Sequence, residues 1–173
     1  IGKPVSGIDM GPGGGLILRL AMPVFNGSGL LGYVGVGREI RGILEAIRKR
    51  NPGVELAIVV RKDLVDRAVW DQGLYPPGKK DEWDRLPASV ILHASQGRLP
   101  DAFAAILRAA PSHLPGETAG REVADGGRIW RMKRSSLKDV IDSAVGDILV
   151  MADITALKAG FDRDIFLTSA AAA

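Results

Sequence analysis

The chain has 173 residues, a formal net charge of +3 and a hydrophobic content of 46%, which is typical of a globular protein with a buried core. It has no cysteine, which excludes disulfides, thiolate metal sites and cysteine nucleophiles. The 23 basic and 20 acidic residues are nearly balanced and evenly spread, which argues against a nucleic-acid-binding surface.

The first regular elements are strands. Residues 5–10 predict a short strand, and a glycine-rich loop over 11–15 leads from it to longer strands at about 16–25 and 30–37. The link between these two strands, Asn26-Gly27-Ser28-Gly29, is rich in residues that tolerate positive φ, so we predict a β-hairpin. The glycine loop has two interpretations, an anion cradle of backbone N–H groups or a plain turn, and the plain turn is the commoner.

The second strand of this hairpin leads directly into a helix at about 38–50. Its apolar residues recur at i, i+3, i+4 and i+7, as Ile40, Ile43, Leu44 and Ile47. Asn51-Pro52-Gly53 ends the helix and marks a domain boundary. A hairpin that continues into a stiff helix can pass a small displacement along it, so we expect the helix to be a mechanical link.

The middle of the chain alternates strands and helices. An apolar run over 54–60 predicts a central strand, and 90–94 predicts a shorter one. Helices are expected within 63–73 and from Pro100-Asp101 to just before Pro111. The composition of 74–87 and 111–120 predicts loops.

The last third of the chain predicts further strands, including a second hairpin of 128–137 with 145–154. Residues 121–124 and 128–135 can form strands around a tight turn at Asp125-Gly126-Gly127. A strong strand over 145–154 is expected to pair with 128–137, and a helix follows within 156–173. The order of elements predicts an α+β fold with a mostly antiparallel sheet.

Several blocks of sequence resemble the double Cache sensor domains of bacterial chemoreceptors, sensor histidine kinases and cyclic-di-nucleotide signalling receptors. The blocks are GKPVSGIDMG at 2–11, Leu18-Arg19 with Pro23-Val24-Phe25, LLGYVGVGREI at 30–40, and VGDILVMADIT at 145–155. The resemblance covers about 2–62 well and 128–157 moderately. Position 9 is Asp where Glu is expected, and the first strands and long N-terminal helix of the membrane-distal module are missing, so we expect an N-terminally truncated chain.

The resemblance implies PAS-like antiparallel sheets flanked by helices, in three parts. Residues 1–50 would be the end of the membrane-distal module with its connecting helix, 51–155 the membrane-proximal PAS-like module, and 156–173 an exit helix towards the membrane. It also implies a ligand-sensing, non-enzymatic role in the periplasmic or extracellular portion of an inner-membrane protein. The membrane would be contacted only through flanking helices absent from the sequence, since no apolar run here is long enough to span a bilayer.

The partners implied are a small molecule, such as a carboxylate or an amino acid, and a second copy in the full receptor. No nucleic acid and no cofactor are expected. His93 has no carboxylate within several residues. His113 has Glu117 four residues on, but Pro115 and Gly116 between them disfavour a shared helix face, so no metal site is predicted.

Six residues are candidates for ligand binding. Asp9 and Arg19, on adjacent predicted strands, would either hold a polar ligand or form a strand-to-strand ion pair. Tyr33 would either line the same pocket or pack in the core. Arg61, Trp130 and Arg131 are candidates for a second pocket.

Neighbouring residues of a strand face opposite sides, so Trp130 and Arg131 cannot both point inward, and we expect Trp130 in the core. Trp70 and Trp83 are expected to be structural.

Two other functions stay open. One is a ligand-free structural or dimerisation module of a receptor, which would have a filled core without a polar cavity. The other is a small enzyme such as a hydrolase, with Asp63, Asp66 or Glu82 as acid or base, although the sequence holds no assembled catalytic constellation.

Overall fold

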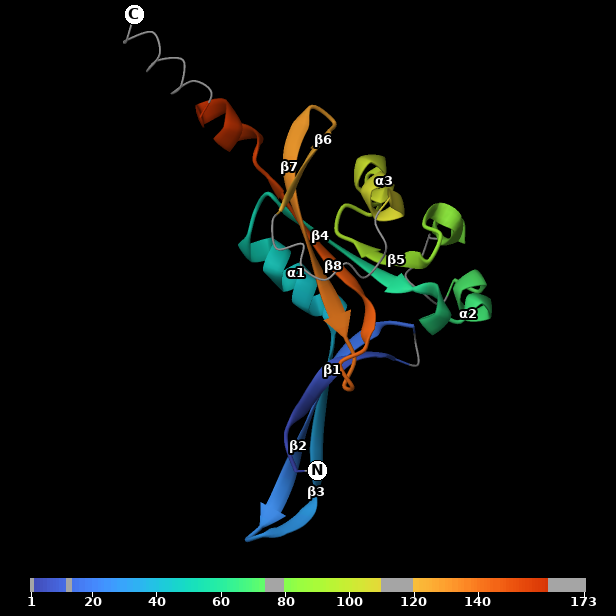
Figure 1. The fold of residues 1–173 in the computed structure, drawn as a ribbon, viewed down its shortest axis with the longest axis vertical. Coiled ribbons are helices and arrows are strands. Elements are labelled where there is room, and N and C mark those ends of the chain that lie inside the picture. The colour runs from blue at the N-terminus through green and yellow to red at the C-terminus, as the bar shows by residue number, and fades with distance from the viewer. Residues whose placement is uncertain (1, 12–13, 74–79, 110–119, 162–173) are drawn as a thin grey trace, which may run out of the picture.

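Two antiparallel sheets form the framework of the computed structural model, which describes residues 2–11, 14–73, 80–109 and 120–161 (Figure 1). The smaller sheet has the strand order β1-β2-β3, and the larger has the order β5-β4-β8-β7-β6. The smaller sheet consists of β1 (Val5–Met10), β2 (Leu16–Asn26) and β3 (Gly29–Glu39). The larger sheet consists of β4 (Val54–Arg61), β5 (Ser89–Ala94), β6 (Arg121–Asp125), β7 (Arg128–Lys138) and β8 (Ala144–Asp153).

Short helices connect and cover the strands. They are α1 (Ile40–Arg50), α2 (Arg67–Asp71), α3 (Asp101–Ala109) and the 3-10 segments η1 (Lys62–Leu64) and η2 (Lys80–Arg85). A further helix follows β8 at 155–161. All strand pairs in the described residues are antiparallel, which confirms the predicted α+β fold.

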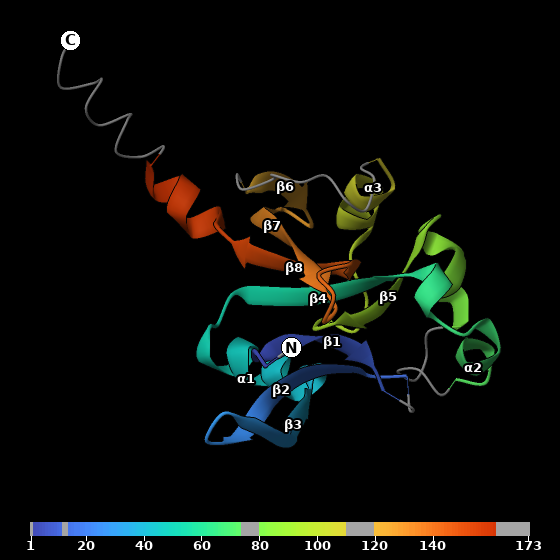
Figure 2. The same cartoon turned by 60° about the horizontal axis from the view of Figure 1, so that its bottom comes forward.

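Both faces of the larger sheet are buried at β4 and β5, because other elements cover these strands from two sides (Figure 2). One face packs against α3, where Phe103 and Leu107 meet apolar residues of β4, β7 and β8. The other packs against α1 and the near end of the smaller sheet, through Ile8, Leu16 and Leu44. The larger sheet therefore separates two cores.

The transition from β3 to α1 is direct, as predicted. Glu39, the last residue of β3, has an extended backbone at the N-cap position, and Ile40 begins the helix. The last turn of α1 carries Arg48, Lys49 and Arg50, whose positive charges suit the negative end of the helix dipole. The helix ends where the Asn51 side chain donates to the Ile47 carbonyl over 2.8 Å.

The β2–β3 hairpin projects away from the larger sheet (Figure 1). Asn26 pairs with Gly29, and Gly27 in the turn has a φ of 57° that favours glycine. Most apolar side chains of the hairpin are exposed. They are Leu18, Leu20, Met22, Val24, Phe25, Leu30, Leu31, Tyr33, Val34 and Val36.

The smaller sheet repeats part of the larger one. Three consecutive antiparallel strands followed by a helix occur twice, as β1-β2-β3-α1 and as β6-β7-β8 with the helix at 155–161. This repetition agrees with a division into two modules. The boundary at 51–53 and the three-part division stay predictions.

The structure differs from the sequence prediction in two places. The helix expected within 63–73 is split, because Val65 is extended and Asp66 starts a new helix by accepting from the N–H groups of Ala68 and Val69. The loop expected over 74–87 contains η2, because Trp83 packs edge-on to Trp70 with ring centroids 5.5 Å apart. Tertiary packing therefore orders a segment whose composition predicts a loop, and both tryptophans are structural, as expected.

Some predictions fall largely or wholly outside the described residues. They are most of the loop over 111–120, most of the C-terminal helix, which is described only as 155–161, and His113.

Gly7 of β1 lies directly against the backbone of the β7–β8 turn. A Cβ atom at this position would overlap the backbone of Asp139 and Val140, including the Asp139 carbonyl oxygen at 2.8 Å. Only a residue without a side chain lets β1 approach this turn so closely.

We predict that Gly7→Ala lowers the free energy of unfolding by about 1–3 kcal/mol, because backbone atoms must shift to admit the methyl group. The matched control is Gly42→Ala on α1, where the added Cβ meets nothing within 4 Å. The control should raise stability by about 0.5–1 kcal/mol, since alanine favours helix. Urea unfolding of both variants tests this, and equal midpoints for Gly7→Ala and the parent chain would contradict it.

Candidate functional site

The structure brings Asp9 and Arg19 together as a surface ion pair. The Arg19 Nε donates to an Asp9 carboxylate oxygen over 2.9 Å, and both side chains are about half exposed, at 49% and 54%. Tyr33 pairs with Pro23, four residues along β2 from Arg19, so it lies about 13 Å away along the strand. The three do not form one pocket, and a ligand role for them stays a prediction.

Arg61, Trp130 and Arg131 are also not brought together. Trp130 is buried in the core edge-on to Phe103, as expected, while Arg131 is exposed and bonds to Glu122 over 3.2 Å. Arg61 binds Asp63 and the Ala144 carbonyl at the far end of β4. Arg131 pairs with Ala152 of β8, which in turn pairs with Val54 at the start of β4. Arg131 therefore lies about 20 Å from Arg61 along the strand direction.

The glycine loop uses its own backbone groups. The Gly11 N–H donates to the Gly15 carbonyl over 2.7 Å, and the Gly14 N–H donates to the Gly11 carbonyl over 2.9 Å. These two amides are therefore directed at the turn itself, which favours the plain-turn interpretation over an anion cradle.

The three carboxylates considered for catalysis have separate structural partners. Asp63 pairs with Arg61, and Asp66 caps α2. Glu82 binds Arg85. They do not converge on one site.

A different pair of charged residues lies at the edge of the α3-covered core. On β7, Trp130, Met132 and Arg134 share the face that packs against α3, and Asp147 continues the matching row of β8. The Arg134 guanidinium donates to an Asp147 carboxylate oxygen over 2.6 Å. Their side chains are only 10% and 4% exposed, so this is a buried ion pair.

A cavity of about 290 Å³ opens beside this pair, between the sheet and the end of α3. Its lining combines apolar residues with a few polar groups. The lining residues are Val59, Leu86, Pro87, Ala88, Ser89, Leu107, Arg108, Ala109, Arg134 and Asp147. A concave site with mostly apolar walls and a small number of convergent polar groups is what small-molecule sites in proteins share.

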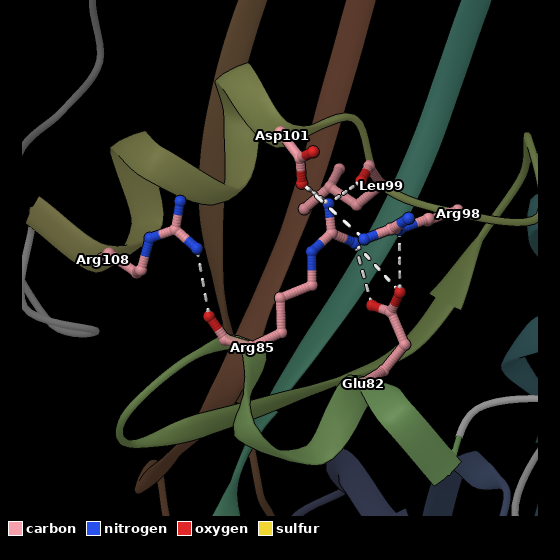
Figure 3. Close-up of polar contacts among 6 residues, drawn as sticks. All are labelled: Glu82, Arg85, Arg98, Leu99, Asp101 and Arg108. Carbon is pink, nitrogen blue, oxygen red and sulfur yellow. Dashed lines mark hydrogen bonds and ion pairs between the residues drawn. The ribbon is translucent and has the colours of Figure 1, made fainter.

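A network of charged groups fixes α3 against the segment before β5 (Figure 3). The buried Arg85 guanidinium binds Glu82 at 2.9 Å and Asp101 at 2.7 Å, and it also donates to the Leu99 carbonyl. Arg98 approaches Glu82 at 3.2 Å. The hydrogen bond and the charge of Arg85 lower the pKa of Asp101 below its usual value of 3.8.

Arg108 reaches back from the last turn of α3 to the same segment (Figure 3). One of its terminal nitrogens lies 3.4 Å from the Arg85 carbonyl oxygen. This contact holds the exposed guanidinium at the rim of the cavity, next to Leu86.

The strands that carry the buried pair continue to the helix at 155–161. The Asp153 carboxylate accepts from the backbone and hydroxyl of Thr155, at 3.0 and 2.6 Å, and so starts that helix. Lys158 binds Glu122, which also binds Arg131 on β7. These bonds lower the pKa of Glu122, with the Lys158 hydrogen bond the largest cause.

The sequence held one pattern that could have identified this site. Asp147 interrupts an otherwise apolar strand, and Arg134 falls on the same alternation as Trp130 and Met132. Two opposite charges on the buried faces of paired strands indicate a buried ion pair. Neither Arg134 nor Asp147 is among the six residues predicted for ligand binding from the sequence.

In the part of the chain that the structure describes, no three His, Cys, Asp or Glu side chains lie close enough to hold a metal ion. His93 borders a small cavity between the β1–β2 turn and α1. Within the same residues, every helix is too short or too polar to cross a bilayer.

Comparison with protein families gives one match over most of the chain. A family model described as a double sensory domain of two-component sensor kinase matches residues 2–157. No curated protein matches the chain.

Two similar solved structures are chemoreceptor ligand-binding domains. That of Pseudomonas fluorescens CtaA, in complex with L-leucine, has 14% identity and a TM-score of 0.36, with 87% of this chain and 53% of that one covered. That of Pseudomonas aeruginosa PAO1 PctB, in complex with L-Arg, has 17% identity and a TM-score of 0.36, with 88% and 55% covered. The chain spans about half the length of these structures.

We predict that Arg134→Met lowers the free energy of unfolding by about 3–5 kcal/mol, because it leaves the Asp147 carboxylate buried without its partner. The double variant Arg134→Met/Asp147→Leu removes both charges and should recover most of that loss. Urea unfolding of the three proteins is the measurement. A double variant no more stable than Arg134→Met would contradict the assignment of a coupled buried pair.

We predict that Asp101→Asn reduces the loss of stability in acid. The lowered pKa means that folded Asp101 binds a proton less readily than unfolded Asp101, so it stabilises the fold above about pH 3.8. That contribution disappears as the pH falls towards the folded pKa. The difference between urea midpoints at pH 7 and pH 3 should be smaller in the variant, and an unchanged difference would exclude this role for Asp101.

Proposed function

Because the chain belongs to the family of double sensory domains of two-component sensor kinases, we propose that it detects a small polar molecule and passes the signal on as a change of conformation. The chain is a sensor domain of the double Cache type, as its sequence predicts, and such domains are the extracytoplasmic parts of membrane receptors. The observation that carries the proposal is the family match over residues 2–157.

The cavity beside the Arg134–Asp147 pair is the site proposed for the ligand. Its volume of about 290 Å³ lies near the lower end of the range for small-molecule sites, which suits a compact ligand. The buried pair and Ser89 provide polar groups on an apolar background. A ligand-free structural module would need no such cavity, so this feature favours the sensing function over that alternative.

Two connections lead away from this site. In one direction, β7 and β8 end at the turn that contacts Gly7 of β1. In the other, β8 continues into the helix at 155–161, which Lys158 ties to Glu122 on β6. A ligand that binds one arrangement of β7 and β8 more tightly would shift the population of both connections.

We also propose that the chain has no catalytic activity of its own. Its family is one of sensor domains, and the carboxylates considered for acid–base chemistry instead pair with Arg61, cap α2 and pair with Arg85.

We further propose that the domain dimerises in the full receptor. Sedimentation of a receptor that contains this domain measures that state.

We predict that Ala88→Trp abolishes ligand binding without unfolding the chain. Ala88 is exposed at the cavity, so an indole there would fill the space at little cost to the core. Binding is measured by thermal shift and calorimetry against a panel of carboxylates, amino acids, amines and amides. At least one compound should raise the melting temperature of the parent chain and fail to do so in the variant.

The matched control is Ala46→Trp, an equal increase in size at an exposed position of α1 away from this cavity. It should bind as the parent chain does. Binding that survives Ala88→Trp would place the site elsewhere. A panel with no binder at all would refute this cavity as a sensor site for these classes.

A further inference from the structure

We propose that the cavity beside α3 selects a compact monocarboxylate, whose anionic group lies between Arg108 and Arg134 and whose apolar part lies against Leu86 and Leu107. This inference rests on the proposed sensing function and names the ligand class for the same site. It follows from the balance of charge in the cavity and from the nature of its walls.

The charged groups of the cavity leave one positive charge unmatched. Two guanidinium groups, of Arg108 and Arg134, line it together with a single carboxylate, that of Asp147. Asp147 is already bonded to Arg134 over 2.6 Å. None of the ion pairs among the described residues includes Arg108, whose charge acts on Asp101 only at longer range, so an incoming anion would complete the set.

The same arrangement of charged groups disfavours ligands that carry two negative charges or a positive charge. A second negative charge on the ligand would approach Asp147, which is nearly buried and cannot move into water. An ammonium group would meet two guanidinium groups, and the carboxylate that could pair with it is occupied. A single negative charge is therefore the best match.

The position of Arg108 and the apolar walls of the cavity determine where the carboxylate and the alkyl chain of the ligand would lie. Arg108 is held at the rim by the Arg85 carbonyl, so the carboxylate would enter next to that position. Guanidinium groups bind carboxylates through paired N–H donors, which a neutral amide cannot use equally well. Val59, Leu86 and Leu107 provide apolar surface for a short aliphatic chain.

The experiment compares three probes with one alkyl chain: 4-methylpentanoate, 4-methylpentanamide and 4-methylpentylamine. Calorimetry on the full chain should give binding for the carboxylate at least about tenfold tighter than for the amide or the amine. Arg108→Gln should weaken carboxylate binding about tenfold and leave the fold intact, because Arg108 is exposed. The matched control is Arg98→Gln, an exposed arginine that does not line this cavity.

Each outcome decides the inference. Preferential carboxylate binding that is lost in Arg108→Gln and kept in Arg98→Gln supports it. Equal or tighter binding of the amine or the amide overturns it, as does carboxylate binding unaffected by Arg108→Gln, and so does a lack of binding by all three probes.

The proposed function is judged separately, by whether any compound of the wider panel loses binding in Ala88→Trp. The ligand class can therefore fail while the sensor site stands.

Discussion

The fold depends on one constraint, which is that both faces of β4 must be covered. Its central residues, from Leu56 to Val60, are all buried, so neither face of this strand can be exposed to solvent. α3 covers one face, and α1 with the near end of the smaller sheet covers the other. The smaller sheet is thus part of the second core as well as a projecting hairpin.

The candidate site lies where one of these covers ends. α3 packs over the apolar rows of β4, β7 and β8 as far as Leu107, and the cavity opens beyond it. At the cavity, the inward-facing rows of β7 and β8 continue with Arg134 and Asp147, which form an ion pair. The Arg85 network fixes the start of α3, because it joins Asp101 and the Leu99 carbonyl to the segment before β5.

Local pattern was enough to predict the framework from the sequence. The period of two in the strands, the glycine-containing turns and the apolar face of α1 all have short-range causes. The sequence failed where a long-range contact decides, as with η2, which is ordered by Trp83 on Trp70. The candidate site was harder still, since Arg61 and Arg131 are eligible by residue type but lie at opposite ends of the sheet.

The buried Arg134–Asp147 pair is difficult to explain by stability alone. Removing two charges from water costs several kcal/mol for each ion, and a well-packed apolar pair of similar volume would usually serve the core as well or better. In the proposed site the same pair would have another use, because its polar atoms are fixed in place by packing before any ligand arrives. A guanidinium that is already oriented and desolvated binds an anion with little further ordering. The position of the pair, where the core gives way to a cavity, fits binding better than it fits support of the fold.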